Sequence, residues 1–353
     1  MLGGFFMKKF LFFLLVLNIS SNHFILARIS PLKRSLFRSC GPINYLDQTS
    51  LANTATIQKS LIMRDGFHKV FFPASDGIMI CGLLRTHPNA QYTVICSGGW
   101  YPGKKEENAA CIDLFDDTSN ILLFDARGHG ESEGRLFDKF CSYGLNEYQD
   151  IIGALDMISS LSTQPIILYG RCAGAFHCAH TLINLNKNNI YSSKYPIAGA
   201  IFDSIWSTVE TTFKNAVTSR LKESIINKLS YIYRSETKQN LATTNSFKIL
   251  YYAASTLFLT CTDYFLSPEV LSYQYKTELV DKIKTITVPT LFIHAYDDSY
   301  VHIHEAQQLA QEARDAHVWW IETSRHAHHH LLYHHEYKNR LTEFISYAVA
   351  LKS

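Results

Sequence analysis

The chain has 353 residues, of which 33 are basic and 31 acidic, so its formal net charge is only +2. Hydrophobic residues make up 47% and charged residues 18% of the sequence, a composition that excludes intrinsic disorder and supplies a full buried core. The near balance of charge argues against nucleic acid as a partner, because phosphate binding needs concentrated Lys and Arg. Two domains, or one large domain with an insertion, fit this length.

The amino terminus has the pattern of a targeting segment. Lys8 and Lys9 precede the apolar run 10–17, and a short basic segment before about 7–15 apolar residues is typical of a secretory signal. We expect residues 1–27 to be a signal peptide, with Met7 as an alternative start. The alternative is an uncleaved amphipathic anchor that associates with a membrane. Export or membrane association is the expected localisation, and a cytoplasmic one the alternative.

After an expected extension over residues 28–66, short apolar runs alternate with longer helix-like segments such as 145–161. The runs 67–72 and 78–84 predict an antiparallel pair of strands. The later runs are continuously apolar, which is typical of parallel strands covered on both faces. These runs are 93–96, 121–124, 165–169, 198–202, 288–293 and 318–321. The alternation predicts an α/β fold, with a mostly parallel central sheet flanked by helices.

The alternation breaks over residues 207–287, which lack an obvious buried strand and contain helix-like stretches rich in Tyr, Phe and Leu. We interpret this segment as a helical cap inserted between two parts of the core, 67–206 and 288–353. The alternative is a packing insertion with no role in binding.

A nucleophile elbow is predicted at residues 170–174, Gly-Arg-Cys-Ala-Gly, directly after the apolar run 165–169. Gly-x-nucleophile-x-Gly at a strand-to-helix turn holds the nucleophile in a strained backbone conformation, and the glycines permit close approach of their neighbours. The dipole of the following helix favours a thiolate at Cys172. Cys172 is therefore the candidate nucleophile. Arg171 is expected to stabilise the thiolate, to bind an anionic substrate or to lie on the surface.

Such a nucleophile needs an acid and a histidine, which follow it along the chain in that order. Asp298 lies just past the run 288–293, and His326 follows the run 318–321. We predict that Cys172, Asp298 and His326 form a catalytic triad. His328 is the reserve base, because further histidines crowd around His326.

The same histidine cluster raises the question of a metal. The histidines at 328–330 and 334–335 complete no ligand set of familiar spacing, so neither a metal nor another cofactor is expected. We expect them to begin the last helix.

These motifs resemble the α/β-hydrolase superfamily over about residues 67–351. Besides the elbow, residues 125–132 match the loop D-x-R-G-H-G-x-S, and residues 294–301 match H-G-x-x-D-x-x-V with Ala295 in place of glycine. The resemblance implies the α/β-hydrolase fold and selects Asp298 over Asp297 as the acid.

The resemblance also implies an oxyanion hole. One donor is the backbone N–H of Ala173. The other is that of Trp100, with Gly99 as the alternative, because the register of this loop is ambiguous. Two such donors stabilise the charge on a tetrahedral intermediate.

Cys172 occupies the position at which most relatives carry serine. Dienelactone hydrolases resemble this chain in having a cysteine there. The resemblance implies an acyl hydrolase of esters or thioesters that forms a covalent acyl-enzyme, and it does not exclude peptidase activity. The expected partner is a small-molecule acyl substrate with an apolar portion. The alternatives are acyl transfer to an amine or alcohol, and a catalytically silent scaffold.

Overall fold

The structure is a computed structural model that describes residues 59–63, 65–99, 105–134, 146–187, 194–208 and 278–352, with the single residues 212, 215 and 252. The expected signal peptide, most of the expected extension and most of the expected cap lie outside the described residues. The described helices and strands all belong to one compact unit, Asp47–Ser353. Within its described part, no helix is both long enough and apolar enough to cross a membrane.

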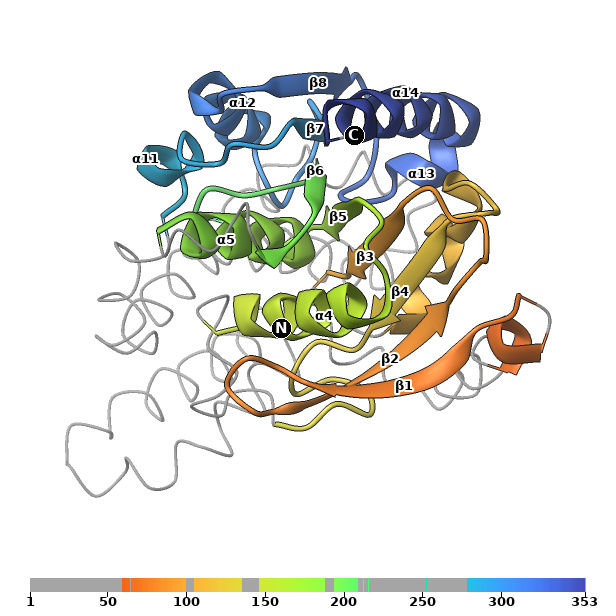
Figure 1. Ribbon diagram of the computed structural model, residues 1–353. Helices are drawn as coiled ribbons and strands as arrows, with labels where there is room; N and C mark the ends of the chain where they lie inside the picture. The colour runs from red at the N-terminus through yellow and green to blue at the C-terminus, as the bar shows by residue number, and fades with distance from the viewer. Residues whose placement is uncertain are drawn as a thin grey trace, which may run out of the picture. The chain divides into compact units, whose positions relative to one another are not determined.

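An eight-stranded sheet runs through the unit in the order β1-β2-β4-β3-β5-β6-β7-β8 (Figure 1). The strands are β1 (His68–Pro73), β2 (Met79–Arg85), β3 (Thr93–Ser97), β4 (Asn120–Phe124), β5 (Ile166–Arg171), β6 (Ile197–Asp203), β7 (Thr290–Ala295) and β8 (Ala316–Ile321). Strand β2 is antiparallel to β1 and β4, and the remaining pairs are parallel. The predicted fold and its opening antiparallel pair are confirmed.

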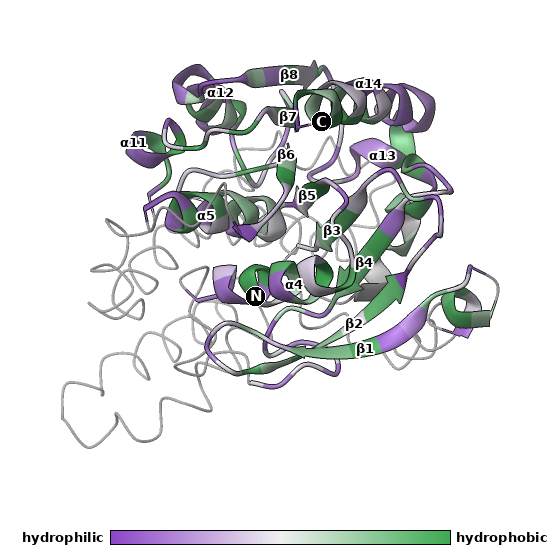
Figure 2. Ribbon diagram, viewed as in Figure 1, coloured by the Kyte–Doolittle hydropathy of each residue, from purple (hydrophilic) through white to green (hydrophobic). Residues whose placement is uncertain are grey.

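Helices cover both faces of the sheet. Among the described residues, these include the 3-10 helix η3 (Lys105–Leu114), α4 (Tyr148–Leu161), α5 (Ala173–Lys187), α11 (Val280–Ile283), α12 (Ile303–Glu312), α13 (His329–Leu332) and α14 (His334–Lys352). Helices α4 and α5 belong to one apolar cluster and η3 and α14 to the other (Figure 1). This two-sided cover explains why β3, β4 and β5 are buried at every position, and Figure 2 shows hydrophobic residues along these strands.

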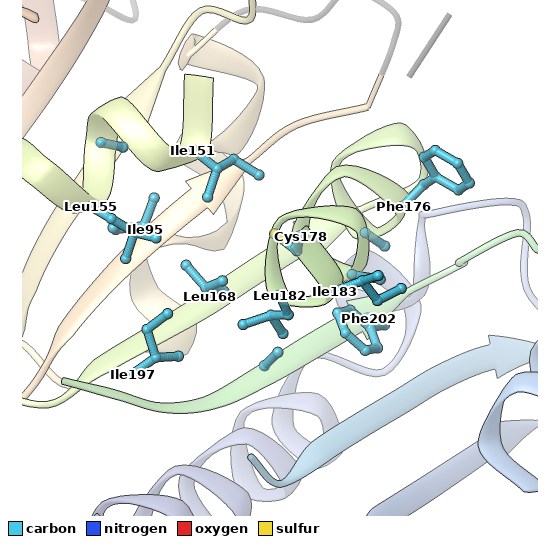
Figure 3. Packing of buried hydrophobic residues seen from close by; sticks show 14 of the residues in the cluster. Ile95, Ile151, Leu155, Leu168, Phe176, Cys178, Leu182, Ile183, Ile197 and Phe202 are labelled. Carbon is cyan, nitrogen blue, oxygen red and sulfur yellow. The ribbon is translucent and has the colours of Figure 1, made fainter. Parts of the chain in front are cut away.

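The packing under α4 and α5 fixes the strands that carry the site. Figure 3 shows side chains of β3, β5 and β6 meeting those of the two helices. Each of the labelled residues is 0% exposed: Ile95, Ile151, Leu155, Leu168, Phe176, Cys178, Leu182, Ile183, Ile197 and Phe202. Full burial of one such aliphatic or aromatic side chain stabilises a fold by about 1.5–3 kcal/mol. The carboxyl ends of β5 and β6 therefore rest on a rigid layer.

The loop after β4 carries the D-x-R-G-H-G-x-S motif, and its arginine is a buried anchor. Arg127 is 1% exposed. Its Nη1 atom lies 2.7 Å from Asp76 Oδ2 and its Nη2 atom 2.8 Å from Asp150 Oδ1. Because a guanidinium presents several donors in one plane, a single side chain ties β4 to the β1–β2 turn and to α4.

Candidate active site

Cys172 occupies the sharp turn between β5 and α5. Its φ of 54° lies in the left-handed region, where non-glycine residues are strained. The backbone holds it there: the N–H of Cys172 donates to the carbonyl of Asp203 at 2.8 Å, and its own carbonyl accepts from the N–H of Ala175 at 3.1 Å. The side chain is neither fully buried nor fully exposed, and its sulfur is a free thiol.

The two glycines of the elbow are required by close approach. A Cβ on Gly170 would lie 2.5 Å from the Cα of Ala175, and a Cβ on Gly174 would lie 2.0 Å from the carbonyl oxygen of Ser97. Backbone atoms cannot yield to such contacts. The Gly-x-Cys-x-Gly spacing is therefore needed to pack α5 against β5 and against the end of β3.

The first turn of α5 lies beside the loop that follows β3. Ala173 is the first residue of the helix, and backbone N–H groups in the first turn of a helix have no intrahelical partner. Gly99 is buried in the loop after β3, whereas Trp100 lies outside the described residues. Of the expected oxyanion donors, the described part of the chain thus contains Ala173 and Gly99, the alternative to Trp100.

His326 and Asp298 are joined by a hydrogen bond of 2.7 Å between Nδ1 and Oδ2. Asp298 lies in the turn after β7, and its side chain is 0% exposed. The other carboxylate oxygen accepts the N–H groups of Tyr300 at 2.8 Å and Val301 at 3.1 Å. A carboxylate held by two backbone donors cannot rotate, so it fixes both the orientation and the tautomer of the imidazole.

His294 explains the spacing of the H-x-x-x-D-x-x-V pattern. It is fully buried at the end of β7, and its Nε2 lies 2.9 Å from the carbonyl oxygen of Val301 and 3.5 Å from Asp298 Oδ2. Burial lowers the pKa of His294, which the nearby carboxylate offsets only in part. A neutral imidazole whose Nε2–H donates to Val301 closes the turn around the acid.

The charges of the site act on His326. Burial alone would lower the pKa of His326, but the Cys172 sulfur and the Asp298 carboxylate raise that pKa well above its usual value. The Cys172 side chain lies close enough to this imidazole to raise its pKa through both charge and hydrogen bonding. The ring of Tyr300 packs against the imidazole at 5.2 Å between centroids. The structure thus brings Cys172, His326 and Asp298 together.

Two neighbours are placed differently from the sequence expectations. His328, the reserve base, is exposed and bonds through Nδ1 to the carbonyl of His326 at 2.7 Å. Arg171 was expected to stabilise the thiolate, to bind an anion or to lie on the surface. It is 4% exposed, and its Nη1 lies 3.4 Å from His330 Nε2. The expected surface position is therefore wrong, because the side chain is buried. Stabilisation of the thiolate and binding of an anionic substrate stay predictions.

Sequence reasoning missed a buried polar cluster next to the site. It comprises Asp203, Ser204, His329 and Tyr337, each 0% exposed. The pair Asp-Ser directly after the apolar run 198–202 was the signal that could have revealed it. The histidines do not all begin the last helix, since His329 and His330 belong to the separate short helix α13. In the described ranges, no group of three or more His, Cys, Asp or Glu side chains is placed to hold a metal ion.

Known proteins share this architecture. The family model described as serine aminopeptidase, S33, matches residues 91–333, which is more than half of the chain. An uncharacterized Bacillus subtilis protein, YqkD, is 24% identical, and the match covers 77% of each chain.

Several solved structures have the same fold. An esterase from Pyrococcus furiosus is 16% identical, with a TM-score of 0.52 and coverage of 80% of this chain and 91% of its own. An esterase from Exiguobacterium antarcticum has the same identity and TM-score, and covers 80% and 99%. A proline iminopeptidase from Mycobacterium smegmatis is 13% identical, with a TM-score of 0.54 and coverage of 81% and 100%. With its sheet order and the family match over residues 91–333, the chain belongs to the serine aminopeptidase S33 family of α/β hydrolases.

Proposed function

We propose that this protein is an acyl hydrolase of esters or thioesters in which Cys172 is the nucleophile, His326 the acid and base, and Asp298 the residue that orients the imidazole. The observation that carries the proposal is the imidazole of His326, which is hydrogen-bonded at 2.7 Å to Asp298 and lies near enough to the Cys172 sulfur for that sulfur to raise its pKa. A thiolate beside an imidazolium is a stronger nucleophile than a hydroxyl and needs less help from its base.

In the first half-reaction, the sulfur attacks the carbonyl carbon and a carbon–sulfur bond forms. The resulting oxyanion is stabilised by the N–H of Ala173 and by that of Trp100 or Gly99. The tetrahedral intermediate then expels the alcohol or thiol, which takes the proton from His326 Nε2. The products are a free leaving group and a thioester on Cys172.

In the second half-reaction, neutral His326 takes a proton from water, and the hydroxide attacks the thioester carbonyl. The carbon–sulfur bond breaks, the free acid leaves, and the thiolate–imidazolium pair is restored. Asp298 stabilises the imidazolium in both halves without itself taking the proton.

We further propose that the acyl group has an apolar portion and that the substrate is a small molecule. Cys172 and Tyr300 both pack against the apolar cluster under α5, and the expected cap is rich in aromatic residues. We also propose that the protein is exported, or associates with a membrane through its amino terminus, where it would meet such substrates. Amino-terminal sequencing of the protein from each cell fraction tests this localisation.

The central test compares hydrolysis of a panel of p-nitrophenyl esters and acyl thioesters by wild type and by Cys172→Ala. We expect Cys172→Ala to abolish turnover, and mass spectrometry of rapidly quenched wild type to show one acyl group on the Cys172 peptide. The matched control is Cys178→Ala, which removes a fully buried thiol from α5, the helix that follows Cys172, and should retain turnover.

Two results would reject the proposal. Unchanged turnover in Cys172→Ala would remove Cys172 from the chemistry. Absence of both turnover and acylation in wild type across the panel would favour the silent scaffold. Added amines or alcohols that divert product from free acid to amide or ester would instead show acyl transfer.

A further inference from the structure

A buried hub of polar atoms, formed by Asp203 and Ser204, lies directly behind the proposed triad. Asp203 is the last residue of β6, and Ser204 follows it with a φ of 58°, in the left-handed region. Both residues are 0% exposed, and the Ser204 hydroxyl donates to Asp203 Oδ1 at 2.7 Å. A buried serine with a positive φ costs conformational free energy, so its surrounding contacts must hold it in place.

On one side the hub holds the nucleophile. The backbone N–H of Cys172 donates to the carbonyl of Asp203 at 2.8 Å. Arg171 pairs in register with Asp203 across β5 and β6, and its buried guanidinium lowers the pKa of Asp203. Asp203 thus hydrogen-bonds both to the backbone of the elbow and to the hydroxyl of Ser204.

On the other side the hub holds the base. The Ser204 oxygen accepts the N–H of Ala327, the residue after His326, at 3.1 Å. Ala327 has a φ of 53°, so it too is strained. His329 Nε2 lies 3.0 Å from the Ser204 oxygen and 3.2 Å from Asp203 Oδ1.

The hydrogen bonds of the hub determine where its protons lie. A serine hydroxyl has one proton, and that of Ser204 is used toward Asp203. His329 must therefore donate from Nε2 to the Ser204 oxygen and to Asp203. Burial alone would raise the pKa of Asp203, but His329, Ser204 and Tyr337 outweigh it and the pKa is lowered. The hub is consequently an anionic carboxylate surrounded by donors, and burial lowers the pKa of His329, which the Asp203 carboxylate offsets only in part.

This cluster is not a second catalytic triad. Serine and carboxylate both contact the same nitrogen of His329, whereas in a triad they contact opposite nitrogens. Ser204 is also completely shielded, so no substrate can reach its oxygen.

We infer that Ser204 is a positioning residue, whose hydroxyl fixes the backbone next to His326 at a set place relative to Cys172. The inference rests on the proposed function, because it assigns Ser204 to the proposed pair of nucleophile and base. If the hydroxyl is removed, Ala327 loses its acceptor, His329 loses one of its two acceptors, and the strained turn can relax. The His326 ring then moves away from the sulfur.

The test is Ser204→Ala, with Ser119→Ala as its matched control. Ser119 is 1% exposed and also donates one hydrogen bond, at 2.6 Å to the carbonyl of Asp116. It lies before the start of β4, at the opposite end of the sheet from the elbow. Both variants lose a buried hydroxyl, but only one loses it beside the proposed site.

Two readouts are needed that a general loss of stability would not change. The first is the rate at which iodoacetamide alkylates Cys172 at about pH 6, followed on the Cys172 peptide by mass spectrometry. The second is the NMR titration of the His326 ring, assigned by difference from His326→Ala. In Ser204→Ala we expect alkylation to slow by about tenfold, since misplacement by about 1 Å can cost up to a hundredfold. We also expect the pKa of His326 to fall toward its ordinary value of about 6.5.

The outcomes separate this inference from the proposed function. If His326→Ala does not slow alkylation of Cys172, the proposed function fails and the inference with it. If His326→Ala slows alkylation but Ser204→Ala behaves like Ser119→Ala in both readouts, only the inference is overturned. Should Ser204→Ala not fold, Ser204→Gly replaces it, because glycine adopts the positive φ without strain. The same two readouts then decide.

Discussion

The hydrogen bond between Asp298 and His326 predicts a specific pH dependence of folding stability. Burial alone would raise the pKa of Asp298, but the charge of His326 and its hydrogen bond lower that pKa from 3.8 to about 2. Each unit of pKa difference between the folded and unfolded chain is worth about 1.4 kcal/mol. Compared with an unfolded value of about 3.9, the ionised Asp298 stabilises the fold by roughly 2.6 kcal/mol at neutral pH, of which roughly 2 kcal/mol is lost by pH 2.

The sign of this effect is fixed by linkage. A carboxyl with a lowered pKa stabilises the fold above its unfolded pKa, and the contribution is lost as the pH falls through the folded value. Asp298→Asn keeps the shape of the side chain and removes its charge. Between pH 5 and pH 2, the free energy of unfolding of wild type should therefore fall by roughly 2 kcal/mol more than that of the variant.

His326 adds an effect of opposite direction. Its raised pKa stabilises the fold fully below the unfolded value of about 6.5, and this contribution is lost as the pH rises through the folded value. Asp298→Asn removes one of the two groups that raise this pKa. The loss of stability toward alkaline pH should therefore also be smaller in the variant.

The assay is urea unfolding at a series of pH values, followed by the fluorescence of the four tryptophans. The matched control is Asp156→Asn in α4. That carboxylate is 45% exposed, accepts from the Tyr195 hydroxyl at 2.7 Å and pairs with Lys194 at 2.6 Å. An exposed ion pair is worth at most about 1 kcal/mol, so its removal should change the acid limb of the curve much less than that of Asp298. An Asp298→Asn curve that runs parallel to wild type from pH 5 to pH 2 would refute the view that His326 holds Asp298 ionised.

Three further substitutions test the frame of the site. Gly174→Ala places a Cβ 2.0 Å from the carbonyl oxygen of Ser97, so we expect a marked loss of thermal stability; wild-type melting would show that the elbow can relax. Arg127→Met leaves the buried carboxylate of Asp150 without its partner, and the free energy of unfolding should fall by about 3–5 kcal/mol; a loss below about 1 kcal/mol would contradict a buried pair. Tyr337→Phe removes a donor 2.8 Å from the carboxylate that ends β6. Its expected cost is about 1–3 kcal/mol in urea unfolding, and no cost would mean that water replaces the hydroxyl.

The strands could be predicted from the sequence because their constraint is simple. A parallel strand between two helical layers must be apolar at nearly every position, and the runs 93–96, 121–124 and 198–202 lie within the observed β3, β4 and β6. The ends were less well defined. Strand β5 extends to Arg171, a charged residue whose burial no apolar run could indicate.

The candidate site was predictable where its residues are set by local geometry. The elbow needs glycines at fixed offsets because α5 folds back onto β5 within a few residues. The turn after β7 needs His294, Asp298 and Val301 because their side chains and backbone close on one another within eight positions. Which imidazole meets Asp298 was less certain, since His326 and His328 are two residues apart. Only the placement of the last loop separates the half-buried ring of His326 from the exposed ring of His328.

The hub formed by Asp203 and Ser204 could not be predicted from a local sequence motif. Its hydrogen bond to Ala327 joins residues 123 positions apart, and that to His329 joins residues 125 apart. By composition alone, Asp, Ser and His at the end of a strand and in a loop are expected to face solvent. They are buried because the end of β6 lies between the elbow and the loop after β8. There it accepts a hydrogen bond from each of them, from the N–H of Cys172 and from the N–H of Ala327. Polar residues that order a site from behind can thus be recognised only after folding has brought their partners to them.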